Sequence, residues 1–169
     1  MGSRYDIAVY RGTTLPDFMQ ALDREEPIGP VVEGPWAGAS QMTIAQVDTA
    51  NGPNIVVAAP PMRRPRGIDS RLAKRLGAEA LFATVWDSVS TYSLRVVGEG
   101  VDRSLSAEPD EEDGGAPLAS THGEPLPEEP GWPDLDEAYV QQVFKGRCGI
   151  DPGVLPTYDA VWYAYAPGK

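Results

Sequence analysis

The chain has 169 residues, enough for one domain with a hydrophobic core of its own. Its single cysteine, Cys148, cannot form a disulfide within the chain, so a reducing, cytoplasmic location is expected. No apolar run reaches the roughly 20 residues that a membrane-spanning helix needs, and the N-terminus does not read as a secretion signal. We therefore expect a soluble, cytoplasmic, single-domain protein without a membrane partner.

The formal net charge of −11 is concentrated in one region. Residues 99–137 include thirteen acidic residues and only one basic residue, Arg103, whereas the rest of the chain is nearly neutral. Neutralising phosphates takes clustered lysines and arginines, so nucleic acid is a disfavoured partner. The acidic region instead predicts a protein partner with a basic surface.

Residues 79–97 predict a central pair of strands, because apolar and polar side chains alternate there with a period of two. A turn at Gly98–Gly100 and a third strand over 101–107 would continue them as a meander. The remaining strand predictions are 5–10, 41–47 and 54–59 joined by an Asn51-Gly52 turn, and 157–165.

Three helices are predicted from apolar spacing and terminal residues. The first covers 15–22 after a Thr14 cap, and the second lies between a cap at Asp69 or Ser70 and a stop at Gly77. The third would begin at an Asp134 cap and end at Gly146.

Two Pro- and Gly-rich stretches complete the prediction: a loop over 28–39 anchored by Trp36, and an acidic loop over 108–131. The expected fold class is α+β, a single domain over 1–169 with about six short, mainly antiparallel strands and three helices.

One pattern extends from the central strands to the third helix, over about residues 80–145. Its residues are Trp86, Ser88, Val89, Tyr92, Gly98, Gly100, Arg103, Leu105, Ser106 and the run Gly123-Glu124-Pro125-Leu126-Pro127-Glu128. This pattern resembles a group of small, uncharacterised α+β domains of high-GC, actinobacterial genomes. The resemblance implies no activity that these residues would carry.

Candidate chemistry is sparse. The basic run 60–67 is the densest cluster of arginines and either binds a phosphate or an acidic partner or forms a solvated, Pro-stiffened connection, which is the favoured interpretation. A Cys148–His122 nucleophilic pair is formally available, but no nucleophile signature surrounds Cys148, so a loop histidine and a buried thiol are the favoured interpretations. The acids of 110–115 lack the spacing of a calcium-binding loop. No catalytic, cofactor or metal site is predicted.

The interpretation that these observations favour is a non-enzymatic protein-interaction module, of the immunity or inhibitor type, with an acidic binding surface. Exposed aromatic residues such as Trp36 or Trp132 would anchor the contact. Two alternatives stay open: a structural subunit of a phage particle or other assembly, and a hydrolase with an unrecognised site. The predicted partner-binding residues are Glu108, Asp110, Glu111, Glu112, Asp113, Glu124, Glu128, Glu129 and Trp132.

Overall fold

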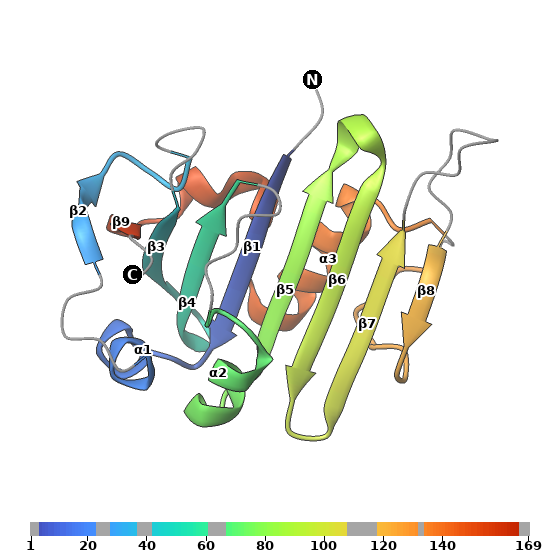
Figure 1. Ribbon diagram of the computed structural model, residues 1–169, viewed down its shortest axis with the longest axis horizontal. Coiled ribbons are helices and arrows are strands. Elements are labelled where there is room, and N and C mark those ends of the chain that lie inside the picture. Colours follow the sequence, from blue (N-terminus) through green and yellow to red (C-terminus); the bar gives the residue numbers. More distant parts are fainter. Residues whose placement is uncertain are drawn as a thin grey trace.

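The computed structural model of the protein describes residues 4–22, 28–36, 42–60, 67–107, 118–131 and 134–165. Within these ranges the chain forms one antiparallel sheet of nine strands in the order β2-β9-β3-β4-β1-β5-β6-β7-β8 (Figure 1). The strands are β1 (Arg4–Arg11), β2 (Ile28–Val32), β3 (Thr43–Thr49), β4 (Gly52–Ala59), β5 (Ala80–Trp86), β6 (Thr91–Gly98), β7 (Val101–Ala107), β8 (Leu118–His122) and β9 (Trp162–Tyr165).

Three α-helices and two short 3-10 helices accompany the sheet in the described residues. They are α1 (Leu15–Ala21), α2 (Ser70–Leu76), η1 (Asp87–Val89), α3 (Glu137–Cys148) and η2 (Pro152–Thr157). The predictions of antiparallel pairing and of three α-helices are confirmed in the described residues. The fold is mainly β with some helices, so the predicted α+β class holds only in outline, and the estimate of six strands is too low.

The centre of the sheet follows the predicted hairpins. Asn51 lies in the turn between β3 and β4, and Thr49 pairs with Gly52 across it. The strands β5, β6 and β7 form the predicted meander, with Gly98 paired to Val101 across a two-residue turn. Gly100 in that turn has a φ of +75°, a conformation that glycine adopts without a steric penalty. β1 lies between these units, because it pairs with both β4 and β5.

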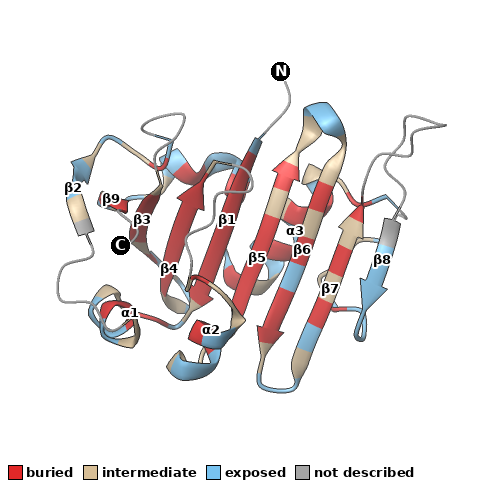
Figure 2. Cartoon of the chain, viewed as in Figure 1, coloured by how far each residue is buried: buried red, intermediate tan, exposed pale blue. Residues whose placement is uncertain are grey.

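Each face of the sheet has its own core. On one face, α3 packs over the middle strands through Tyr139, Val143 and Phe144. On the other face, α1 and α2 lie side by side at one end of β4, β1 and β5, and contribute Phe18 and Leu72 (Figure 1). The central strands are consequently buried on both sides, while β6 and β7 alternate between buried and more exposed residues (Figure 2). This alternation marks one-sided coverage.

Helix capping agrees with the sequence at three of the predicted positions. Thr14 caps α1, Asp69 accepts hydrogen bonds from the backbone N–H groups of Arg71 and Leu72, and Gly77 ends α2 with a φ of +63°. The third helix begins later than predicted, because Asp136 rather than Asp134 accepts the hydrogen bond from the Tyr139 N–H. It also continues past Gly146 to Cys148, where Gly149 caps it in a left-handed conformation with a φ of +74°.

Three segments correct the sequence-based prediction. The predicted loop 28–39 contains the strand β2, which pairs with β9. Its Gly and Pro content led to the prediction of a loop. The predicted acidic loop 108–131 contains β8, the last strand of the sheet. The predicted strand 157–165 is shorter, because residues Pro152–Thr157 form a 3-10 helix and pairing begins at Trp162.

Candidate functional site

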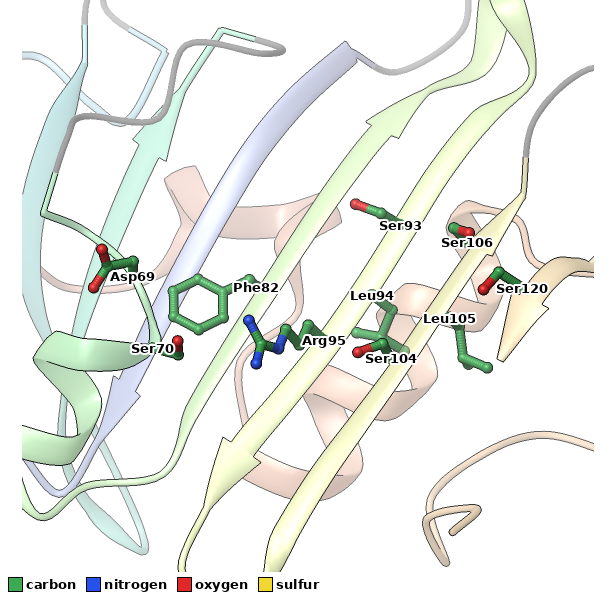
Figure 3. Close-up of a pocket in the computed structure, with 10 residues that line it drawn as sticks. All are labelled: Asp69, Ser70, Phe82, Ser93, Leu94, Arg95, Ser104, Leu105, Ser106 and Ser120. Carbon is green, nitrogen blue, oxygen red and sulfur yellow. The ribbon is translucent and has the colours of Figure 1, made fainter. Parts of the chain in front are cut away.

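Helices cover one face of the sheet only in part, and the uncovered area is polar. The side chains of β6, β7 and β8 on the α2 side point away from the α3 core (Figure 3). They lie opposite one another across the strands, because Arg95 pairs with Ser104, and Ser106 pairs with both Ser93 and Ser120. We call this area the open face and define it by Ser93, Arg95, Ser104, Ser106 and Ser120.

The open face is hollowed beside α2. A hollow of about 290 Å³ lies over the five open-face residues and extends to Asp69, Ser70 and Phe82 (Figure 3). A second hollow of about 590 Å³ continues between α2 and the β6–β7 turn. Ser70 and Arg95 border both hollows, so the two adjoin, and we call them together the depression. Its size falls in the range of small-molecule sites.

The polar groups of the open face retain their hydrogen-bonding capacity. In the described part of the chain, the four serine hydroxyls make no hydrogen bond to another protein group. The Arg95 guanidinium lies 3.6 Å from Asp102, and that ion pair is its only protein contact of this kind within the described ranges. These groups are available to a ligand or a partner surface.

The structure places the predicted acidic binding residues in different surroundings. Glu124 is exposed. Glu128 is half-buried and contacts Arg147, with 3.0 Å between Oε2 and Nη1. Glu129 lies inside the protein and is bound to Arg103, so its carboxylate faces the interior. The other six predicted residues, Glu108, Asp110, Glu111, Glu112, Asp113 and Trp132, lie outside the described residues.

Glu129 belongs to a buried cluster that fixes the segment after β8. Its carboxylate accepts hydrogen bonds from Arg103 at 2.8 and 3.0 Å and from the Tyr139 hydroxyl at 2.7 Å. Burial alone would raise the pKa of Glu129, but the hydrogen bonds from Arg103, the Leu126 N–H and Tyr139 outweigh burial and lower it. The carboxylate is therefore charged at neutral pH and holds β7, the segment after β8 and α3 together.

A second charged cluster involves Glu79. Arg147 of α3 binds Glu79 through two nitrogens, at 2.6 and 2.9 Å, and Arg11 of β1 adds a contact of 2.9 Å. Burial would raise the pKa of Glu79, yet these arginines lower it below its usual value. Two residues of the run Gly123–Glu128 have structural roles here: Leu126 is buried, and Glu128 binds the same Arg147.

His122 and Cys148 occupy separate environments. His122 ends β8 rather than lying in a loop, and its imidazole is exposed, 3.7 Å from Asp102. The Cys148 thiol is buried and donates a hydrogen bond to the Phe144 carbonyl, and burial raises its pKa to about 11. The prediction of a buried small residue at Cys148 is confirmed. A thiol in this state is a poor nucleophile at neutral pH.

Trp36 anchors its own segment to β1, as the sequence predicted. Its ring packs against Tyr5 with 5.5 Å between centroids, and 42% of the residue stays exposed.

Across the described ranges, His, Cys, Asp and Glu side chains form no group of three or more suited to a metal ion. The helices of the described chain are too short and too polar to cross a membrane.

Comparison with known proteins returns no similarity: no family model, curated protein or solved structure matches the chain. The resemblance to actinobacterial domains therefore stays a prediction.

The sequence-based prediction did not identify the open face, although its signal is present. Ser93 and Arg95 alternate with Tyr92 and Leu94, and the third strand shows the same alternation of polar and apolar residues. Such a pattern predicts one polar face. It does not predict that α2 ends short of that face, because helix placement depends on the whole sheet order.

Proposed function

We propose that this protein is a non-enzymatic protein-interaction module whose binding surface is the open face. The observation that carries the proposal is the hydrogen-bonding capacity left unused on that face, where four hydroxyls and one guanidinium lie over three neighbouring strands. Short hydroxyl side chains on a sheet lose little conformational entropy when a partner orders them. A polar, half-buried surface of this kind suits a partner that binds reversibly.

The positions of the acidic residues indicate which kind of partner the protein prefers. The acidic residues of 108–113 follow Ala107 in the sequence, and Ala107 is paired with Leu118 across β7 and β8. Glu124 adds an exposed carboxylate beyond the other end of β8. Acidic residues that neighbour β7 and β8 in the sequence favour a partner with a basic surface and speed its association. Glu128 and Glu129 are not part of this surface, because they bind Arg147 and Arg103.

The first test is affinity capture of partners from a lysate of the source organism, at low and moderate salt. Capture by the wild-type chain is compared with capture by Ser106→Arg, which adds bulk and charge at the centre of the open face. The matched control is Ser88→Arg, an exposed serine in the turn between β5 and β6. We expect loss of one stoichiometric partner with Ser106→Arg alone.

A second comparison tests the charge preference. Reversal of Glu111, Glu112 and Asp113 to lysine should weaken capture and reduce its salt dependence. Glu33→Lys, at an exposed acid after β2, serves as the control. A partner that binds all four variants as tightly as the wild type would contradict the proposal.

A further inference from the structure

The basic residues of the chain are also unevenly distributed. Between residues 63 and 75 the sequence has six basic residues and one acid, Asp69. In the described part of this stretch, α2 exposes Arg71, Lys74 and Arg75. Arg71 and Lys74 border the larger hollow, and Arg95 of β6 borders it from the sheet. Basic residues from a helix and from a strand thus border one depression.

We propose that this depression binds a small oxyanion, the carboxylate or phosphate group of a ligand. Arg95 has the planar fork of donors that pairs with either group. Ser70 and Ser104 lie beside it in the smaller hollow, as potential hydroxyl donors (Figure 3). Lys74 of α2 borders the larger hollow and supplies a further positive charge. The site shares Arg95 and Ser104 with the open face, but its test needs no protein partner, because the free chain is titrated with the anion alone.

Three acids also border the depression and limit what it binds. Asp69 accepts hydrogen bonds from the backbone N–H groups of Arg71 and Leu72 that it caps, and it also pairs with the Arg71 guanidinium at 3.4 Å. Asp102 lies 3.6 Å from Arg95 and 3.7 Å from His122, so it competes with a ligand for Arg95. Glu99 lies on the exposed β6–β7 turn. With three acids against three cations, the site selects one anionic group rather than a polyanion such as nucleic acid.

The experiment is a titration of the isotopically labelled full chain with inorganic phosphate and, separately, with acetate. Ionic strength is held constant with sodium chloride, and backbone amide signals of residues 70–74, 93–95 and 104–106 are followed by NMR. We expect saturable shifts in these three segments. The stronger of the two titrations identifies the phosphate or the carboxylate as the preferred group.

Variants make the test specific to this depression. Arg95→Gln should weaken binding about tenfold, as expected for loss of one charge-assisted hydrogen bond. Asp102→Asn should tighten binding, because it removes the competing carboxylate. Lys145→Gln is the control, because Lys145 is an exposed cation of α3 on the other face of the sheet, where it lies 4.0 Å from Asp151. This variant should bind as the wild type does.

Two results would overturn the inference. One is the absence of saturable shifts with both anions. The other is binding that Arg95→Gln leaves unchanged while the spectrum shows an intact fold. Because the Arg95 side chain is 45% exposed, the variant is expected to fold, so a loss of binding is attributable to the missing guanidinium.

Discussion

Arg103 of β7 and Glu129 of the segment after β8 form a bidentate ion pair, although they are 26 residues apart in the sequence. Their side chains are only 8% and 7% exposed. Removing one member leaves the other charge buried without its partner. Glu129→Gln should therefore lower the free energy of unfolding by about 3 kcal/mol or more. Urea denaturation measures the change. Glu124→Gln, at an exposed acid five residues earlier, should change it by less than about 0.5 kcal/mol, and equal effects would contradict this role.

Stability should fall in acid because of Glu79 and Glu129. Both carboxyl groups have a lowered pKa in the folded protein, so the unfolded chain binds more protons than the folded one in mildly acidic solution. Their contribution is fully present above the ordinary carboxyl pKa and is lost as the pH falls through the folded value. Urea midpoints measured from neutral pH downward should drop below about pH 4.5. The drop should be smaller in Glu129→Gln than in the wild type.

Gly123 should tolerate no side chain. Its φ is +84°, and a Cβ atom there would lie 2.0 Å from the Asp102 carbonyl oxygen. Gly123→Ala combines a strained backbone with a steric clash against β7, and should cost more than about 1 kcal/mol. Gly131→Ala is the control, because nothing lies within 4 Å of the added atom. Thermal unfolding of the two variants would reveal the difference, and matching melting temperatures would be incompatible with the close approach at Gly123.

Cys148 should resist thiol reagents in the folded protein. Cys148 is 1% exposed, and burial raises the pKa of its thiol to about 11. Labelling with an aromatic disulfide reagent at mildly alkaline pH should be slow in the native state and complete in denaturant. Rapid labelling of the native protein would show an accessible thiolate and would revive a nucleophilic role for Cys148.

Sequence patterns predicted the elements that satisfy their own local rules. The strands β5, β6 and β7 have alternating residues and glycine turns, and Asp69 and Gly77 delimit α2, so their positions follow from neighbouring residues alone. In contrast, β2 and β8 are regular only because β9 and β7 pair with them. Their Pro, Gly and polar content predicts loops when the partner strands are not considered.

The candidate site was harder to predict, for a physical reason. A glutamate in an acid-rich sequence predicts a charged surface, yet Glu129 is satisfied by an arginine 26 residues away. Conversely, Ser93, Ser106 and Ser120 come from three strands and form one row only in the folded sheet. Which charges pair internally and which hydroxyls gather therefore depends on register, and a single sequence does not disclose register between distant strands.

The position of β9 has a consequence for the order in which the protein assembles. This strand is the last element of the described chain, yet it lies between β2 and β3, which are among the first. As the chain leaves the ribosome, the β5–β8 meander can form from neighbouring segments, whereas β2 has no strand to pair with until Trp162–Tyr165 has emerged. Synthesis halted before residue 162 would release a chain that can pair the seven strands from β3 to β8 but leaves β3 as an open edge and β2 unpaired.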